Sequence, residues 1–149
     1  MPDQMNKQSV FRTNSLKAYV HDTHRNDLII DRKDTEAIEA FFTVLKPGQK
    51  SPAHEHLDCE QLWYIIEGCG RLVIGNGDEL EEHTIGPGDV VLTRRFTHHR
   101  VENCGDGLLR YLTVDSFIGE KSPKESTWDA HIEVYCRENK SGVRLVDAT

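Results

Sequence analysis

The chain of 149 residues has no long apolar run and only four cysteines, and both shortages narrow what it can be. No segment approaches the ~20 apolar residues of a membrane-spanning helix, and the N-terminal stretch MPDQMNKQSVFRTN lacks the hydrophobic core of a signal peptide. We therefore expect a cytoplasmic protein without a membrane partner. Cys59, Cys69, Cys104 and Cys136 include no C-x-x-C pair, so the sequence indicates neither a zinc ribbon nor a disulfide framework.

Positive charge is also scarce, because 18 Lys and Arg stand against 25 Asp and Glu and give a formal net charge of -7. Such an acidic balance argues against a general surface for nucleic acid or anionic lipid. Arg94, Arg95 and Arg100 form a local basic cluster against this background. Two interpretations of that cluster are open: a solvated loop, or a binding site for the carboxylate of a small molecule.

Short runs rich in β-branched, aromatic and leucine residues recur through the middle of the chain. They are Ala40–Leu45, Leu62–Ile66, Arg71–Ile74, Val90–Leu92 and Leu108–Val114, and turn signals such as KPG, EGCG, GNGD and GPGD lie between them. Regularly spaced short strands with glycine-rich turns predict an all-β sandwich or barrel rather than a parallel α/β sheet.

The two ends of the chain differ from this middle part. The first 20 or so residues are polar and are expected to form an arm or an added edge strand. Near the other end, Ser122, Pro123 and Glu125 form a capping-box start, and Trp128 and later apolar residues recur at helical spacing. We expect a C-terminal helix, although the alternation in IEVYC also permits a strand. The predicted organisation is one domain: an arm and edge strand over 1–35, a barrel over 36–118, and a helix and tail over 119–149.

Two histidines stand two residues apart in the segment GQKSPAHEHLDCEQLWYIIEG, residues 48–68. Side chains at i and i+2 of a β-strand share one face, so His54 and His56 are placed to hold one ion. Glu60 and Gln61 follow, and only one of these neighbours can point inward unless a bulge intervenes. Imidazole ligands suit several transition metals, so the ligand type does not name the ion.

A second segment, GDVVLTRRFTHHRVEN at residues 88–103, adds His99. Together the two segments resemble the paired motifs of the cupin superfamily, which implies a double-stranded β-helix of the jelly-roll type. The resemblance implies one divalent ion, Zn, Fe, Ni or Mn, on His54, His56 and His99. Gln61 occupies the slot usually held by a glutamate and is expected to be the fourth ligand in place of Glu60. The second motif departs from the family where Arg94 and Phe96 replace its proline and glycine.

Strand parity identifies further candidates for the site. If Gln61 points inward, Trp63 shares its face and walls the pocket. Tyr111, Thr113 and Asp115 form one possible inward row, with Asp115 and Tyr111 as catalytic candidates; the alternative has Leu112 and Val114 facing inward. Arg94, Arg95 and Arg100 are expected to bind the substrate near His99. The other histidines, His21, His24, His83, His98 and His131, are assigned no role.

Neutral imidazole and amide ligands leave the charge of a divalent ion uncompensated, so the site should attract anions. We expect a metal-dependent enzyme acting on a small anionic, oxygenated substrate by lyase, isomerase or decarboxylase chemistry, with the ion as Lewis acid. The alternatives are an Fe(II)-dependent dioxygenase and a non-catalytic binding or sensing module. Because a polar arm and a C-terminal helix would be poorly satisfied on a single barrel, a homodimer is also expected.

Overall fold

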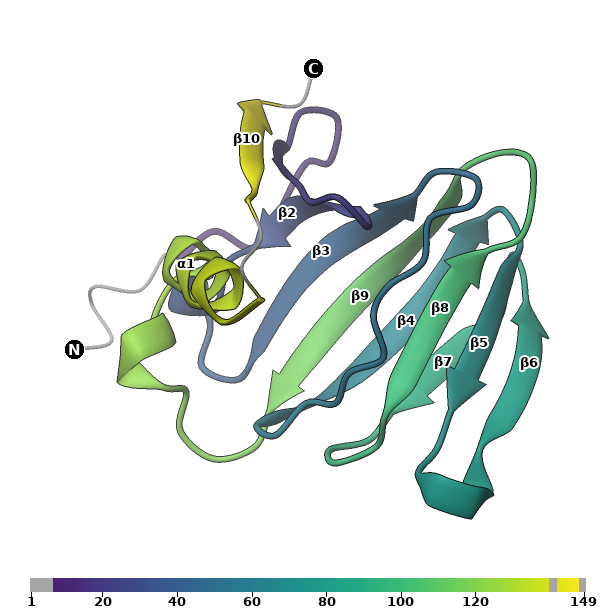
Figure 1. Ribbon diagram of the computed structural model, residues 1–149. Helices are drawn as coiled ribbons and strands as arrows, with labels where there is room; N and C mark the ends of the chain where they lie inside the picture. Colours follow the sequence, from purple (N-terminus) through teal and green to yellow (C-terminus); the bar gives the residue numbers. More distant parts are fainter. Residues whose placement is uncertain (1–6, 140–141, 148–149) are drawn as a thin grey trace.

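The computed structural model describes residues 7–139 and 142–147, which form two antiparallel sheets facing each other and one α-helix (Figure 1). The larger sheet has the strand order β10-β1-β2-β3-β9-β4-β7, and the smaller has the order β6-β5-β8. The strands are β1 (Lys17–Val20), β2 (Arg25–Ile30), β3 (Ile38–Leu45), β4 (Cys59–Glu67), β5 (Gly70–Ile74), β6 (Glu81–Ile85), β7 (Val90–Thr93), β8 (His99–Asn103), β9 (Leu109–Phe117) and β10 (Arg144–Asp147). The predicted all-β jelly roll with a short C-terminal helix is confirmed.

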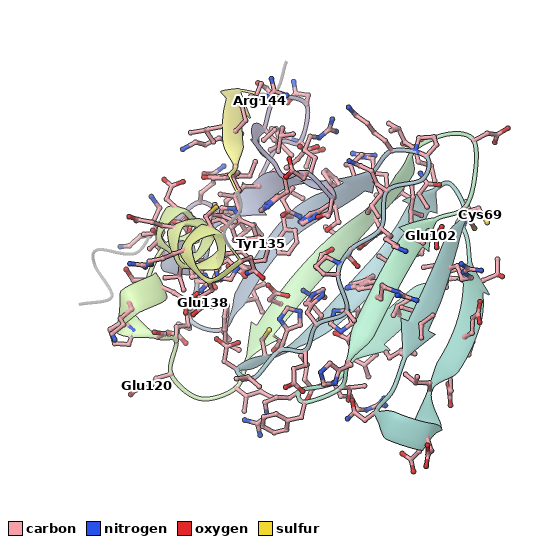
Figure 2. All side chains as sticks on the ribbon, viewed as in Figure 1. Cys69, Glu102, Glu120, Tyr135, Glu138 and Arg144 are labelled. Atoms are coloured by element: carbon pink, nitrogen blue, oxygen red, sulfur yellow. The ribbon has the colours of Figure 1, made fainter. Side chains whose placement is uncertain are left out.

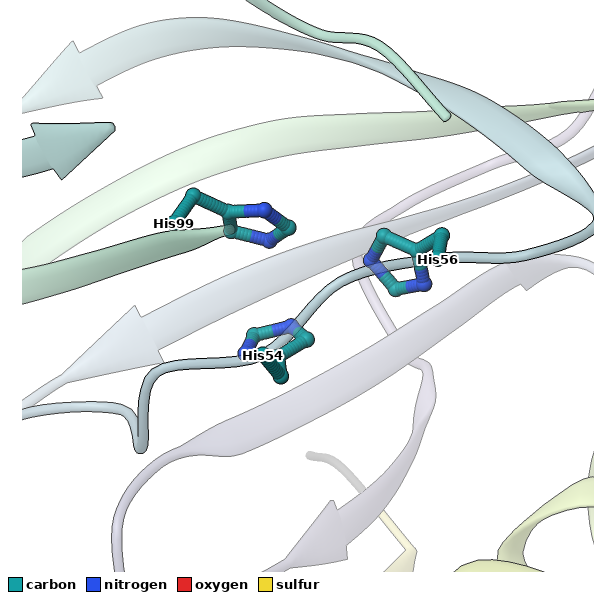
Figure 3. A group of neighbouring side chains, drawn as sticks. All are labelled: His54, His56 and His99. Carbon is teal, nitrogen blue, oxygen red and sulfur yellow. The ribbon is translucent and has the colours of Figure 1, made fainter. Parts of the chain in front are cut away.

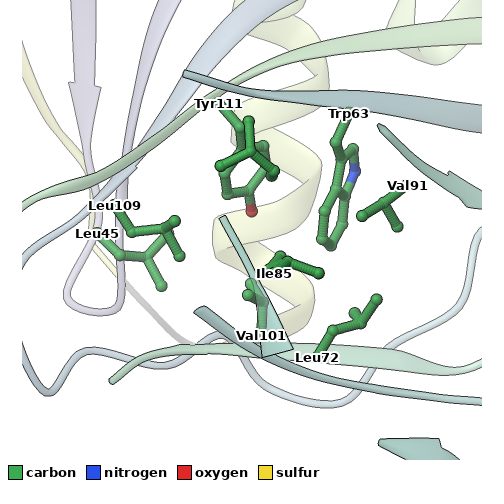
Figure 4. Packing of buried hydrophobic residues seen from close by; sticks show 9 residues of the cluster. Leu45, Trp63, Leu72, Ile85, Val91, Val101, Leu109 and Tyr111 are labelled. Carbon is green, nitrogen blue, oxygen red and sulfur yellow. The ribbon is translucent and has the colours of Figure 1, made fainter. Parts of the chain in front are cut away.

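The space between the sheets is filled by apolar side chains that alternate with outward-facing ones. In β4, for example, Trp63 and Ile65 are buried while Leu62 and Tyr64 are exposed. The resulting core is the cluster in Figure 4: Leu45, Trp63, Ile65, Leu72, Ile85, Val91, Val101, Leu109 and Tyr111. Each such side chain contributes about 1.5–3 kcal/mol when fully buried. This core therefore holds the two sheets together and supports the strands that carry the site.

The segment between β3 and β4 runs beside β8 and brings the first histidine pair to the third histidine. Ser51 N donates to Val101 O at 2.9 Å, and His54 and His99 exchange backbone hydrogen bonds at 3.1 and 2.9 Å. The segment thus acts as a further antiparallel partner of β8, with His54 directly opposite His99. Residues 45 positions apart in sequence are in this way fixed side by side.

The C-terminal helix α1 (Trp128–Asn139) begins later than the capping pattern predicted. Ser122 makes no capping bond, and Pro123–Glu125 forms a separate 3-10 turn. Thr127 Oγ1 instead accepts from Ala130 N at 3.1 Å, which makes Thr127 the N-cap. The alternative of a strand at IEVYC is wrong, because those residues lie inside α1. No helix in the described part of the chain is long and apolar enough to span a membrane.

Helix α1 packs on the β1–β3 end of the larger sheet, where Trp128 and Ile132 contact Tyr19 and Phe41. The Trp128 ring lies 4.6 Å from that of Phe41, and Tyr19 Oη donates to Asp129 Oδ1 at 2.5 Å. The expected arm of residues 1–20 contains β1, which pairs with both β2 and β10; residues 1–6 lie outside the described part. The described part of the N-terminal arm therefore finds its strand partners, and the helix its packing partners, within one chain.

Two of the scattered cysteines meet in the fold. Cys69 and Cys104 lie on neighbouring turns, at the end of the smaller sheet away from α1 (Figure 2), with sulfur atoms 3.2 Å apart. Both are free thiols. Spacing along the chain gave no hint of this pair, because the β5–β8 register creates it.

Candidate metal centre

Three imidazoles from two segments converge inside the barrel. His99 starts β8, while His54 and His56 come from the segment beside it, and the rings face one another (Figure 3). One ligand atom from each of the three histidines lies within 4.8 Å of the other two. Ring centroids are 4.2 Å apart for His54 and His99, and 5.1 to 5.2 Å apart for the pairs with His56. This arrangement offers three nitrogen ligands to a single ion.

Hydrogen bonds and burial leave suitable nitrogens free for an ion. His54 Nδ1 lies 2.8 Å from Pro52 O and His99 Nδ1 lies 3.4 Å from Thr97 O, so both can donate there and keep Nε2 as a lone-pair donor. His56 Nε2 and His99 Nε2 are buried and have no hydrogen-bond partner. Leaving a buried polar atom unpaired costs ~1–3 kcal/mol. A bound metal ion would remove this cost, so the three histidines fit a metal centre.

Burial also keeps these rings neutral. Burial is the main cause that lowers the pKa of His56 to about 4 and that of His99 to about 3, and neighbouring imidazoles lower both further. The pKa of His54 is lowered as well, again chiefly by burial. At neutral pH the nitrogens are thus unprotonated, and a metal ion does not have to displace protons from them.

A steep acid sensitivity of the metal-free protein should follow. Burial lowers the pKa of His21 to about 4 and of His99 to about 3, below the unfolded value of ~6.5, so the unfolded chain binds protons first. The stability these groups confer is complete above pH ~6.5 and is lost as the pH falls toward 4, at about 1.4 kcal/mol per unit of pKa difference. Thermal unfolding in EDTA at pH 7, 6 and 5 should show a falling midpoint. A midpoint unchanged between pH 7 and 5 would contradict the buried, neutral state.

Gln61 takes the inward position in β4. It is 7% exposed, whereas Glu60 is only half-buried on the other face. The side chain of Gln61 interacts with both His56 and Asp115. Its Oε1 already accepts a hydrogen bond from Trp63 Nε1 at 2.7 Å. An amide oxygen has a second lone pair, so ligation by Gln61 stays a prediction that the orientation of the side chain supports.

Phe96 stands where the family motif has glycine, and its backbone is left-handed with φ 68°. A non-glycine residue in this region costs about 1–2 kcal/mol. Phe96 N donates to His56 O at 2.9 Å, and Asn76 Nδ2 donates to Phe96 O at 2.8 Å. The turn keeps the glycine-like conformation without glycine, and it ties the β7–β8 connection to the histidine pair.

Beside the histidines, a buried polar row crosses the larger sheet. Asp115 lies between Glu39 and Gln61 in the strand register, and Glu39 forms a bidentate ion pair with Arg32 at 2.8 and 3.0 Å. Burial, followed by the hydrogen bond and negative charge of Glu39, raises the pKa of Asp115 well above its usual value. Asp115 Oδ1 has no hydrogen-bond partner. The row thus places a buried carboxyl group, whose ionised form is disfavoured, next to Gln61.

The histidines and this carboxyl group line one cavity of about 350 Å³. The inward-facing side chains of β9 are Tyr111, Thr113 and Asp115 and not Leu112 and Val114, so the first of the two alternatives for this strand is correct. Trp63 also lines the cavity, stacks on Tyr111 at 4.7 Å and is 3% exposed. The cavity therefore combines a metal-binding end, an acid group and aromatic walls.

The three arginines expected to bind substrate are not at this cavity. No Arg or Lys is among the described residues that line it. Arg100 alternates with the buried His99 and Val101 in β8 and is exposed, and Arg94, just after the end of β7, is exposed as well. Arg95 stacks instead on Phe96, at 4.7 Å from the ring centroid. The structure does not support their predicted role.

Three further histidines do line the cavity, although the sequence gave them no role. His21 and His24 come from the β1–β2 turn, and His131 comes from α1. The spacing H-D-T-H at residues 21–24 was the available signal, but only tertiary packing brings this turn and the helix to the cavity.

Comparisons with known proteins agree with this architecture. The chain matches the family model described as a cupin domain over residues 41–115, which is half of its length. It is 30% identical over 69 residues to an uncharacterized protein of Methanocaldococcus jannaschii, and 33% identical over 42 residues to auxin-binding protein 5 of Zea mays. These matches span 46% and 28% of this chain but only 52% and 27% of the relatives.

Solved structures share the fold at lower sequence identity. A predicted oxalate decarboxylase from Thermotoga maritima matches 74% of this chain over its whole length, with 22% identity and a TM-score of 0.65. The polyketide cyclase RemF from Streptomyces resistomycificus matches 79% of this chain over 89% of its own, with 22% identity and a TM-score of 0.61. The CENP-C cupin domain of Drosophila melanogaster matches 78% over 80% of its own, with 18% identity and a TM-score of 0.64. At these identities the likeness shows the fold alone.

Proposed function

The protein belongs to the cupin family, and on that basis we propose that it is a metal-dependent enzyme acting on a small anionic, oxygenated substrate by lyase, isomerase or decarboxylase chemistry. The observation that carries this proposal is the convergence of three imidazoles, two of them with buried, unpartnered Nε2 atoms, in a cavity that also holds Asp115. A purely structural core would leave neither the imidazole nitrogens nor the carboxyl oxygen unpaired, and acid–base catalysis at a metal ion uses both kinds of group.

His54, His56 and His99, with Gln61 as the fourth ligand, are the residues that would hold the ion. A divalent ion there supplies a Lewis acid that polarises a substrate oxygen and stabilises developing negative charge. The fit rests on neutral, unprotonated donors, because burial lowers the pKa of all three histidines. Neutral ligands leave the positive charge available to an anionic substrate.

Asp115 is the proposed proton donor and acceptor. Burial and the neighbouring Glu39, which is paired with Arg32, raise the pKa of its carboxyl group well above the usual value and so favour the acid form. In this form Asp115 can protonate a carbon or oxygen that gains electrons in the reaction, and afterwards accept a proton from the product or from water. A raised carboxyl pKa in a cavity is a frequent property of such groups.

Trp63 and Tyr111 are proposed to shape the substrate site. Their stacked rings form a wall beside His99, whose ring centroid is 5.7 Å from that of Trp63. Tyr111 is 3% exposed and its hydroxyl interacts with Thr43, so this wall excludes water while it offers one polar group. A substrate bound between this wall and the histidines would be oriented toward Asp115.

Small acids should stabilise the metal-loaded protein. Because no Arg or Lys lines the described cavity, the attraction for an anion comes from the ion itself. A thermal-shift screen of hydroxy and keto acids should raise the unfolding midpoint by about 5 °C at concentrations ~100-fold above Kd. The corresponding amides and alcohols should have no such effect, and EDTA-treated protein should not respond. Stabilisation by neutral or cationic compounds only would contradict the proposal.

A homodimer is proposed as well, but through the outer face of the larger sheet and not through the N-terminal arm and the C-terminal helix. The outer face of β4 and β7 exposes a paired apolar patch: Leu62 opposite Leu92 and Tyr64 opposite Val90, with 39 to 60% of each residue accessible. Contiguous exposed apolar surface of this kind marks interaction sites, and a second copy of the sheet offers a self-complementary partner. The cytoplasmic location stays a prediction that cell fractionation would test.

Leu62→Glu should disrupt this dimer by burying charge in the patch. Light scattering at micromolar concentration should give twice the chain mass of 17.0 kDa for the wild type and the mass of one chain for the variant. Leu80→Glu is the matched control, because Leu80 is 58% exposed on the connection before β6, away from the patch. A 17.0 kDa wild-type particle, or a dimer that survives Leu62→Glu, would refute the assignment.

A further inference from the structure

Two thiols face each other at the end of the smaller sheet where Figure 2 labels Cys69. Cys69 lies in the β4–β5 turn and Cys104 in the β8–β9 turn, and their sulfur atoms are 3.2 Å apart. Each of these turns connects the larger sheet to the smaller one. Neither cysteine is among the described residues that line the cavity. The pair is therefore separate from the candidate metal centre.

The backbone places the two cysteines at a spacing that a disulfide can span. The register of β5 and β8 pairs Gly70 with Asn103. Cys69 and Cys104 occupy the next facing position, and Cys104 N donates to Cys69 O at 3.2 Å. Facing residues of antiparallel strands have Cα atoms ~4.5–5.5 Å apart, and disulfides join Cα atoms that are ~4.4–6.8 Å apart. Side-chain rotation is thus sufficient to join the two sulfurs.

Contacts that do not involve sulfur hold both turns in place. In the β8–β9 turn, the buried Asn103 donates to Gly107 O at 2.8 Å and accepts from Gly105 N at 3.0 Å. The β4–β5 turn rests against this turn, because a Cβ atom at Gly68 would lie 2.3 Å from Leu108 O. Reacting groups that are fixed side by side behave as an intramolecular pair at high effective concentration.

The two sulfurs differ in their access to solvent. Cys104 is exposed and Cys69 is half-buried. The hydrogen bond with Cys104 raises the pKa of Cys69, so Cys69 is the thiol that keeps its proton and Cys104 is the one that meets a dissolved reagent first. The other cysteines are less suited to reaction, since Cys59 is buried and Cys136 packs against the cluster under α1.

We propose that Cys69 and Cys104 form a dithiol–disulfide site that exchanges with small-molecule disulfides of the glutathione class. The Cys104 thiolate attacks one sulfur of the small disulfide and displaces the other as a thiolate, which leaves a mixed disulfide on Cys104. Cys69 then loses its proton, attacks the Cys104 sulfur and displaces the second small thiolate. The cysteine pair loses two electrons and two protons, and the small disulfide gains them as it becomes two thiols. This inference does not depend on the proposed function.

Oxidation should stabilise the fold, because the new bond closes the chain over residues 69–104 and joins two turns that connect the sheets. Wild-type protein is incubated with oxidised glutathione, then unfolded and alkylated for mass spectrometry. Free thiols should fall from four to two per chain, with one peptide pair linked through Cys69 and Cys104. The thermal unfolding midpoint should rise by roughly 5–10 °C. Dithiothreitol should restore both the thiol count and the original midpoint.

Single variants separate the two steps. Cys69→Ser should stop at the mixed disulfide, with one glutathione on Cys104 and no rise in the midpoint; Cys69→Ala takes its place if the serine variant does not fold. Cys104→Ser should lose most of the reaction, because the exposed sulfur is gone. Cys136→Ser is the matched control and should still form the linked pair. The proposal is overturned if wild type keeps four free thiols, if the link joins other cysteines or two chains, or if the midpoint does not rise.

Discussion

Replacing His99 by alanine should lower bound metal from about one ion per chain to less than about a tenth of that value. His99 supplies one of three converging imidazoles, and its Nε2 is buried without another partner. With only two histidines left, the site falls below the three protein ligands that a catalytic metal ion normally requires. Elemental analysis after dialysis against the divalent ion measures the stoichiometry, and circular dichroism checks that the β-fold persists.

His98→Ala provides the matched control. His98 is the neighbouring residue, its side chain is 52% exposed, and its Nδ1 bonds to Asn76 outside the cluster. This variant should keep its metal. Glu60→Ala should also keep it, whereas Gln61→Ala should weaken it, because only Gln61 points inward. A full complement of metal in His99→Ala would refute the site, and severe loss in Glu60→Ala would transfer the fourth position to Glu60.

The change Asp115→Asn should reduce turnover by about 10²- to 10⁴-fold while metal binding is retained. The amide has the same shape and can still bond with Gln61, but it cannot transfer a proton. Turnover is measured with whichever acid stabilises the metal-loaded protein, and metal content is measured on the same sample. Turnover within a few-fold of wild type would remove Asp115 from the chemistry.

Stability offers an independent control for this variant. The folded pKa of Asp115 is raised, so its contribution is complete below the unfolded pKa of ~3.9 and is lost as the pH rises toward the folded value. At pH 7 Asp115→Asn should consequently be at least as stable as wild type. Ser116→Ala, one residue along the strand and exposed, should change neither turnover nor stability appreciably.

The five apolar runs of the sequence predicted five of the ten strands in the described part of the chain, and the first 20 or so residues, which contain β1, were expected to form an arm or an added edge strand. β3, β4, β5, β7 and β9 coincide with the five predicted runs to within a few residues. β6 was missed because four of its five residues, in EEHTI, are exposed and polar. β1 and β10 form an edge pair whose strand character comes from pairing with each other and with β2. The β-strand propensity of a segment is a weak predictor wherever pairing with other strands determines whether the segment forms a strand.

For the site, motif spacing was sufficient to select three histidines that the fold brings together. The arginines show the opposite case. Strand alternation from an inward-facing His99 already places the side chain of Arg100 on the outer face, whereas its closeness to His99 in sequence had suggested a place at the cavity. His21 and His24 could not be found in this way, because a turn and a helix distant from the motifs bring them to the cavity.

Metal content of wild-type protein, purified without added metal or chelating resin, tests the central claim most directly. The account predicts about one divalent transition ion per chain, with no oxygen consumed when a stabilising acid is added. Iron together with oxygen uptake would replace the proposed chemistry by that of a dioxygenase. Less than about a tenth of an ion per chain, unchanged after dialysis against zinc, manganese, nickel and ferrous iron in turn, would contradict the metal-dependent function and favour a non-catalytic binding module.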